Sequence, residues 1–261
     1  MNGDETSVTS AQWQAWLRRW DAQQAGYLPA REERFAAMLD VLEAVLPAAF
    51  VAVDLACGPG AISQRLLARF PNGRCVAVDT DPVLLALGRG ALGDQDGRLR
   101  WVQADLTDAS WTTSVGEDQV DAVLSTTALH WLPGDALARL YRDLGRLVRP
   151  GGVFLNGDRC GFPPHMPTFR ALAGGERAWR PSDPQGGGED WQTWWDALRR
   201  EPGLAALFAE RERRLAWRQP FEQRWEAPIY DFNEAALREG GFREVGVVWQ
   251  RLDDRVLLAV R

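Results

Sequence analysis

The stretch Val51-Ala-Val-Asp-Leu-Ala-Cys-Gly-Pro-Gly60 constrains the fold of this chain more than any other segment. A short apolar run carries an acid near its end, and a glycine-rich turn follows at once. The next ten residues, 61–70, have the apolar spacing of a helix. Gly58 and Gly60 lack a Cβ, so the backbone can turn sharply there and approach a ligand closely. The pattern predicts a strand, a tight loop and a helix, the first half of a βαβ unit.

Two later segments repeat this arrangement of an apolar run that ends in an acid. Residues 74–79 end at Asp79, and residues 99–105 end at Asp105. Ligands of open α/β sheets bind outside the carboxyl ends of the strands, so Asp54, Asp79 and Asp105 are expected to line one crevice. Asp79 lies at the distance from the glycine loop where a carboxylate accepts hydrogen bonds from ribose hydroxyls. The three acids together predict a nucleoside-binding site, although each alone is also compatible with a helix cap or a turn.

With the glycine loop, Asp79, Ala104-Asp105-Leu106 and Arg149-Pro-Gly-Gly152, the chain resembles the class I S-adenosylmethionine-dependent methyltransferases. The resemblance covers residues 49–160 and, more weakly, 230–261. It implies that the loop packs against the methionine half of S-adenosylmethionine, that Asp79 holds the ribose, and that Asp105 and Leu106 meet the adenine edge. The predicted cofactor residues are Asp54, Ala56, Gly58, Gly60, Asp79, Thr80, Asp105, Leu106, Thr126, Trp20 and Arg31.

The expected fold is α/β, a doubly wound and mostly parallel sheet of seven strands of the Rossmann-like methyltransferase type. Strands are expected at 50–55, 74–79, 99–104, 120–125, 152–157, 243–251 and 255–261, the last two as an antiparallel pair. Helices are expected at 10–24, 31–46, 60–70, 82–92, 134–147, 189–200, 203–218 and 231–239. The expected division is N-terminal helices over the cofactor site (1–48), a core (49–159 and 230–261) and a Trp-rich cap insertion (160–229).

The segment 124–132, Leu-Ser-Thr-Thr-Ala-Leu-His-Trp-Leu, follows the fourth expected strand and would face the transferring methyl group. It lacks the Asn/Asp-Pro-Pro-Tyr run that enzymes acting on exocyclic nitrogens of nucleic-acid bases often carry. Its Ala-Leu-His-Trp run resembles small-molecule members such as the trans-aconitate methyltransferases. His130 is a candidate general base, because the ordinary pKa of imidazole lies near neutrality; a purely structural histidine is the alternative. His165 is a second candidate.

The acceptor is predicted to contact Tyr27, His130, Trp131, His165 and Trp194. Since methyl transfer is a direct displacement, a Trp-rich cap could align the reactants and exclude water. The same tryptophans could instead form only a satellite core. Arg31 could bind the carboxylate of the cofactor, or pair with neighbouring glutamates on a solvated helix face.

Composition limits the possible partners. The formal net charge is −6, the pI is about 5.1, and all 30 basic residues are arginines, which argues against a general nucleic-acid binder and excludes lysine chemistry. Three cysteines and two histidines suggest neither a disulfide framework nor a metal site. No secretory signal or membrane span is apparent, so a cytoplasmic protein with a small-molecule substrate is expected; the oligomeric state stays open.

Two alternatives to methyl transfer remain at this stage. A nicotinamide-dependent oxidoreductase would also use a glycine loop, but Ser63 stands where its fingerprint has a third glycine, and Asp54 precedes the loop. A noncatalytic cofactor-binding module acting through a protein partner would use the tryptophans of the insertion as an interface.

Overall fold

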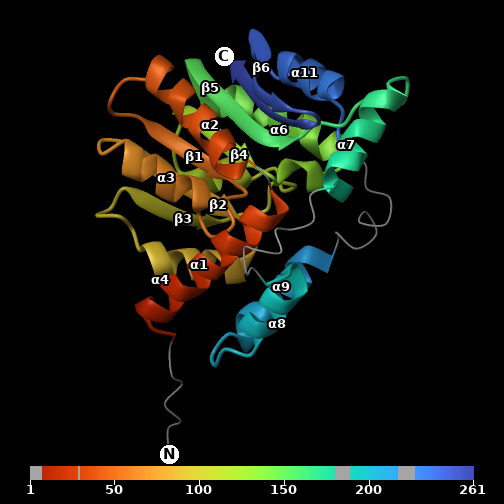
Figure 1. The fold of residues 1–261 in the computed structure, drawn as a ribbon. Helices are drawn as coiled ribbons and strands as arrows, with labels where there is room; N and C mark the ends of the chain where they lie inside the picture. The colour runs from red at the N-terminus through yellow and green to blue at the C-terminus, as the bar shows by residue number, and fades with distance from the viewer. Residues whose placement is uncertain (1–7, 29, 180–188, 217–226) are drawn as a thin grey trace, which may run out of the picture.

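A computed structural model describes residues 8–28, 30–179, 189–216 and 227–261, and it contains a seven-stranded sheet (Figure 1). The strand order is β3-β2-β1-β4-β5-β7-β6. The strands are β1 (Val51–Leu55), β2 (Arg74–Asp79), β3 (Leu99–Gln103), β4 (Val120–Thr126), β5 (Val148–Arg159), β6 (Glu244–Arg251) and β7 (Asp254–Val260).

The first five strands are parallel, and β7 runs antiparallel to both β5 and β6. β1 is buried along nearly its whole length, which explains why it reads as a continuous apolar run instead of an alternating one. The predicted α/β fold, with a mostly parallel sheet and an antiparallel final pair, is confirmed. Because the parallel strands share one direction, their carboxyl ends meet at one edge of the sheet.

Helices cover both faces of the sheet. The helices are α1 (Ser10–Tyr27), α2 (Arg31–Val45), α3 (Ala61–Arg69), α4 (Pro82–Leu92), α5 (Trp111–Val115), α6 (Gly134–Leu147), α7 (Pro167–Trp179), α8 (Trp191–Arg199), α9 (Ala205–Leu215) and α11 (Tyr230–Glu239), with a 3₁₀ turn at Leu129–Trp131. Buried side chains of α2 and α3 share one core with the sheet, and those of α5, α6 and α11 share the core on the other face. This is the doubly wound arrangement.

A third core joins the N-terminal helix to the insertion. Trp16 and Trp20 of α1 pack edge-on against Trp194 of α8, with ring centroids 5.9 and 4.9 Å apart. Trp195 and Phe208 join the cluster, which rests on apolar side chains of α4. Figure 1 shows α8 and α9 at the same end of the molecule as α1 and α4. The helices α1, α8 and α9 therefore pack together in one cluster.

Some elements differ from the sequence expectation. α5 and α7 were not predicted, because α5 has only five residues and α7 contains two glycines. α1 continues to Tyr27, beyond the expected end at residue 24. β5 begins at Val148 and includes the Pro-Gly-Gly segment, where a register shift against β4 accommodates the turn.

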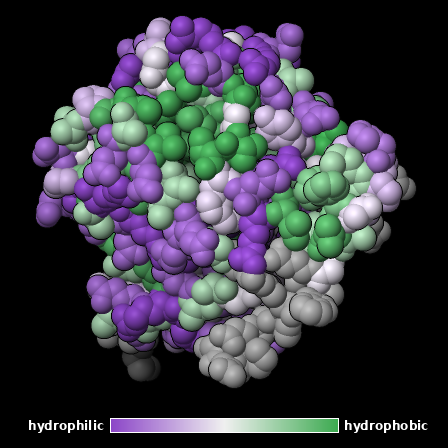
Figure 2. Space-filling model, turned by 45° about the horizontal axis from the view of Figure 1, so that its top comes forward, coloured by the Kyte–Doolittle hydropathy of each residue, from purple (hydrophilic) through white to green (hydrophobic). Residues whose placement is uncertain are grey.

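Hydrophobic side chains also reach the surface around the outer strands. Val247 and Val248 of the edge strand β6 and Val45 of α2 are exposed. The upper end of the molecule in Figure 1 bears β5, β6 and α2. Figure 2 turns this end toward the viewer and shows hydrophobic residues gathered on it. This face lies away from α8 and α9.

One contact between α6 and α11 permits no side chain. A Cβ on Gly145 of α6 would lie 1.7 Å from the carbonyl oxygen of Gly240, at the end of α11. The absence of a side chain at residue 145 lets the two helices touch and close the core on that face.

We therefore expect Gly145→Ala to lower the free energy of unfolding by about 1–3 kcal/mol, the usual range for overpacking. Gly174→Ala in α7 is the matched control, since a Cβ there meets nothing within 4 Å and alanine favours helix. Chemical denaturation of both variants measures the difference. Equal stabilities would contradict the packing account.

Candidate functional site

A cavity of about 350 Å³ opens at the carboxyl ends of the parallel strands; we call it the main cavity. It is lined by α1, the loop after β1, the end of β2, the loop after β4, and the helices α8 and α9. The predicted residues that it brings together are Trp20, Tyr27, Arg31, Ala56, Gly58, Asp79, Thr126, His130 and Trp131.

A second, smaller cavity of about 30 Å³ adjoins the main cavity. The two share Ala56, Asp79 and Ala128. The small cavity adds three further predicted residues, Thr80, Asp105 and Leu106. Residues at the ends of β2 and β3 thus extend the crevice away from the insertion.

Asp79 stands at the junction of the two cavities with both carboxylate oxygens fixed. Its Oδ2 accepts a hydrogen bond from the backbone N–H of Gly58 at 2.7 Å, and its Oδ1 accepts one from the N–H of Asp81 at 2.8 Å. A carboxylate oxygen has two lone pairs, so each can also accept a bond from a ligand hydroxyl. The end of β2 is therefore tied to the glycine loop and aimed into the crevice.

Two residues with left-handed backbone bend the chain around the cavity. Ala56 after β1 has φ 54° and Thr127 after β4 also has φ 54°, and both line the main cavity. Such conformations are uncommon outside glycine and cluster at ligand sites. Gly58, with φ 55°, continues the turn of the loop.

Asp54 lies behind the loop instead of in the crevice. It lines neither cavity, and its Oδ2 accepts hydrogen bonds from the N–H and hydroxyl of Ser63 at 3.0 and 2.6 Å. Ser63, the residue that departs from the nicotinamide fingerprint, thus holds the start of α3 to the end of β1. Complete burial raises the pKa of the Asp54 carboxyl to about 7.

This pKa shift predicts a pH-dependent stability. The folded state holds a proton on Asp54 up to about pH 7, whereas the unfolded chain loses it near its ordinary pKa of about 4, so the stability contributed by Asp54 falls as pH rises between these values. Asp54→Asn removes this dependence. Its free energy of unfolding relative to the parent protein should be higher at pH 8 than at pH 5, by denaturant titration. A difference independent of pH would contradict the assignment.

The groups that line the small cavity show what a bound nucleoside would contact there. The Thr80 hydroxyl is buried, lines this cavity and has no hydrogen-bond partner among the described residues. Asp105 accepts hydrogen bonds from the N–H and hydroxyl of Thr107 at 2.8 and 2.7 Å, which fixes its carboxylate. Leu106, Leu129 and Leu132 supply apolar walls. The orphaned hydroxyl, the fixed acid and the apolar walls suit the edge of an adenosine bound across both cavities, since the small cavity of about 30 Å³ cannot enclose a nucleoside by itself.

Arg31 forms a partly buried ion pair at the other end of the main cavity. Its guanidinium lies 2.9 Å from Asp21 of α1 and 3.7 Å from Glu32, and its side chain is 6% exposed. The arginine is therefore not on a solvated helix face. It contributes to the cavity wall together with Trp20.

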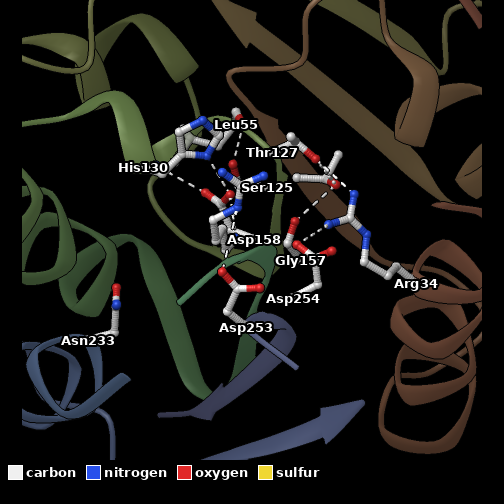
Figure 3. A network of polar contacts seen from close by, with 12 residues as sticks. Arg34, Leu55, Ser125, Thr127, His130, Gly157, Asp158, Asn233, Asp253 and Asp254 are labelled. Carbon is white, nitrogen blue, oxygen red and sulfur yellow. Dashed lines mark hydrogen bonds and ion pairs between the residues drawn. The ribbon is translucent and has the colours of Figure 1, made fainter. Parts of the chain in front are cut away.

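His130 is bound to a buried aspartate that the sequence analysis missed. Its ring Nδ1 lies 2.6 Å from Oδ1 of Asp158, and its backbone N–H donates to Oδ2 at 3.0 Å (Figure 3). Burial alone would raise the pKa of Asp158. The electrostatic attraction of His130 and the hydrogen bonds that His130 and the backbone N–H of Arg159 donate outweigh burial and hold this pKa below its ordinary value. Asp158 is the acid near the carboxyl end of β5, so the pattern used for Asp54, Asp79 and Asp105 could have found it.

Arg34 supports the loop after β4 from behind. Its guanidinium donates to the Thr127 hydroxyl at 2.9 Å and lies 3.9 Å from the carboxylate of Asp254 (Figure 3). The side chain is almost fully buried. This contact helps to fix the strained backbone at Thr127.

The insertion is anchored on the crevice by Arg211 of α9. Its Nε donates to Oδ2 of Asp81 at 2.7 Å, and its guanidinium lies 3.9 Å from the ring centroid of Trp195. Asp81 also caps α4 by accepting from the N–H groups of Val83 and Leu84. Arg211 is not singled out in the sequence analysis, because its partner is 130 residues away in the chain.

Four predicted residues lie outside both cavities. Besides Asp54, these are Gly60, His165 and Trp194. Gly60 packs beneath the loop, where a Cβ would lie 2.6 Å from the Trp101 ring. His165 is exposed, and Trp194 is fully buried in the tryptophan cluster.

Among the described residues, no group of three or more His, Cys, Asp or Glu side chains is placed to hold a metal ion. None of the helices in the described part of the chain is long and apolar enough to cross a membrane.

Comparison with known proteins indicates a family for the central part of the chain. Residues 52–152, which include the glycine loop, Asp79 and the segment after β4, match the model of a methyltransferase domain. Residues 52–152 are therefore similar to methyltransferase domains. This match supports the family predicted from the sequence, whose members use S-adenosylmethionine as the methyl donor, and it favours methyl transfer over the nicotinamide-dependent alternative.

Curated relatives agree with this assignment. The chain is 38% identical over 135 residues to a trans-aconitate 2-methyltransferase of Azoarcus sp. (strain BH72), covering 51% of this chain and 48% of that protein. It is 34% identical over 167 residues to a protein of the same name from Acidovorax ebreus (strain TPSY), covering 63% and 59%. The matched part of the chain thus spans about half the length of these relatives.

Solved structures show the same fold. An O-methyltransferase family protein from Burkholderia thailandensis superimposes with a TM-score of 0.55 at 20% identity, covering 96% of this chain and 69% of that one. At this identity the likeness concerns the fold alone. The solved structures therefore support the fold, whereas the description of the crevice rests on the residues of this chain.

Proposed function

We propose that this methyltransferase domain transfers the methyl group of S-adenosylmethionine to a small molecule held in the main cavity. The observation that carries the proposal is Asp79, whose carboxylate is fixed by two backbone N–H groups at the junction of the two cavities. A carboxylate in this position accepts hydrogen bonds from the two hydroxyls of a ribose. When bound, the donor supplies an electrophilic methyl group on a sulfonium.

The residues divide by position along the crevice. Asp105, Leu106 and Thr80 would surround the adenine side, in the small cavity. Ala56 and Gly58 would contact the methionine part, and Trp20 and Arg31 would lie toward its carboxylate. Thr126, the last residue of β4, would lie between the donor and the acceptor side. Tyr27, His130 and Trp131 would face the acceptor.

The packing of α1 against α8 supports a proposed division of the chain into a cap and a catalytic core. Residues 1–48 and the insertion 160–229 would act together as a cap, because α1 and α8 share one tryptophan cluster. The segments 49–159 and 230–261 would be the catalytic core. Closing such a cap aligns the acceptor with the methyl group and removes water, which supplies much of the rate of a direct displacement.

The acceptor atom of this reaction is an oxygen or nitrogen of a compact metabolite. The relatives named trans-aconitate 2-methyltransferase make a carboxylate one candidate class. A carboxylate is ionised at neutral pH and needs no base, whereas a hydroxyl benefits from one.

Asp79→Ala tests the ribose assignment. The variant should bind S-adenosylhomocysteine at least about tenfold more weakly, because two charge-assisted hydrogen bonds are lost. Isothermal titration calorimetry measures the affinity. Asp108→Asn is the control, since this exposed aspartate serves only a local turn. Unchanged affinity in a folded Asp79→Ala variant would contradict the assignment.

Arg211→Gln tests the anchoring of the cap. Losing the ion pair to Asp81 should weaken S-adenosylhomocysteine binding several-fold, because Asp81 and Asp79 hold the same turn and a partly buried charge loses its partner. Arg213→Gln is the matched control, as Arg213 lies exposed on the same helix and pairs with Glu210. Equal affinities of the two variants would show that the contact does not support the site.

A further inference from the structure

Aromatic rings dominate the acceptor side of the main cavity. Tyr27 and Trp191 line it with 47% and 42% of their surfaces exposed, and the Tyr27 hydroxyl accepts a hydrogen bond from the N–H of Trp191 at 3.0 Å. Trp131 lies beside His130, with ring centroids 4.9 Å apart. Flat apolar surfaces of this kind favour a planar, largely apolar acceptor.

The charges around the cavity do not suit a polycarboxylate. Of the described lining residues two are arginines, and each is already in an ion pair, Arg31 with Asp21 and Arg211 with Asp81. Asp79 and Asp81 line the same cavity, and Asp158 lies behind His130. Sites that bind carboxylates normally present arginine forks to the ligand. The two lining arginines are balanced by the two lining aspartates, so the described lining carries no excess of positive charge, which disfavours an anionic acceptor.

His130 and Asp158 form a pair suited to removing a proton. With Nδ1 donating to the buried carboxylate, Nε2 is the ring nitrogen that accepts a proton. The carboxylate orients the ring and stabilises the imidazolium that forms. A carboxylate acceptor would not need such a pair, because a carboxylate carries no proton to be removed at neutral pH.

From these three observations we infer that the acceptor is a hydroxylated aromatic compound, or a similarly flat apolar one, whose hydroxyl is deprotonated by His130. Asp158 acts through His130 as a positioning residue. The new bond joins the acceptor oxygen to the methyl carbon, the carbon–sulfur bond breaks with its electron pair on sulfur, and the hydroxyl proton passes to His130. The inference rests on the proposed methyl transfer.

The electrostatic surroundings of this pair come from several elements. Arg34 of α2 and Asp254 at the start of β7 lie on one side of Asp158. Arg159 and Cys160 follow it in the chain, and Tyr141 of α6 faces it from the opposite layer. Burial raises the pKa of the Cys160 thiol to about 12. Arg34 and Asp254 carry opposite charges and lie 3.9 Å apart, so their charges largely offset one another beside Asp158.

The first test compares acceptor classes on the whole protein. Radiolabelled S-adenosylmethionine is incubated with the protein and a panel of simple phenols and catechols, with their matched benzoates, and with trans-aconitate. We expect methylation of phenolic hydroxyls at rates at least about tenfold above those of the carboxylates. Faster methylation of trans-aconitate or of the benzoates, or methylation of no phenol while the donor binds, would overturn the inference.

The second test separates proton removal from structure. Asp158→Asn and His130→Gln should lower kcat for 4-methylphenol about a hundredfold or more and flatten its pH profile, with little change in S-adenosylhomocysteine affinity. For 4-nitrophenol, which is acidic enough to be ionised at mildly alkaline pH, the loss should be at most several-fold. Asp143→Asn is the matched control, because this half-buried aspartate of α6 pairs with Arg146 and does not line the main cavity. Equal losses for the two phenols would overturn the assigned roles.

The two proposals fail in distinguishable ways. If the protein does not bind S-adenosylhomocysteine, the proposed methyl transfer fails. If it binds S-adenosylhomocysteine and methylates a carboxylate with Asp158→Asn fully active, only the acceptor class and the base are wrong.

Discussion

The Asp79 carboxylate is the constraint on which the site depends. One oxygen holds the glycine loop at Gly58 and the other holds the turn at Asp81, so a single side chain joins the ends of β1 and β2. Asp81 in turn caps α4 and binds Arg211, which lies over Trp195. Through these contacts the same turn that faces the nucleoside side of the crevice also anchors the helices that cover it. Donor binding and cap position are therefore expected to depend on each other.

The parallel sheet explains why these groups meet. Strands β1 to β5 run in one direction, so residues that follow β1, β2, β3 and β4 and those near the end of β5 gather at one edge. In the proposed arrangement Asp79 and Asp105 face the nucleoside, while His130 and its partner Asp158 face the acceptor. Asp54 uses the same geometry for a different purpose, since it is buried and fixes the helix after the loop. Acids at equivalent strand ends thus have different roles, set by what lies next to each.

Sequence alone predicted the strands of the core and the helices α1, α8 and α9, but not the contacts between these helices and the core, for a physical reason. Apolar runs and glycine turns are local signals, so the strands, the glycine loop and the positions of Asp79, Asp105 and His130 could be read from neighbouring residues. The contacts Arg211–Asp81 and Trp16–Trp194 join residues far apart in the chain and leave no local pattern. Trp194 was predicted to contact the acceptor, but it is fully buried in the cluster beneath the cap, and the exposed ring at the cavity is Trp191. Helical spacing indicates which face of a helix is buried, but it does not show which tryptophan of that helix reaches the cavity.

The central claim is that the crevice at the ends of β1, β2 and β3 binds the nucleoside of S-adenosylmethionine. Calorimetric titration of the purified protein with S-adenosylhomocysteine, and separately with NAD, tests it most directly. The account predicts saturable one-to-one binding of S-adenosylhomocysteine with a Kd of about micromolar order, and no binding of NAD. Binding of NAD in place of S-adenosylhomocysteine, or of neither compound, would contradict it.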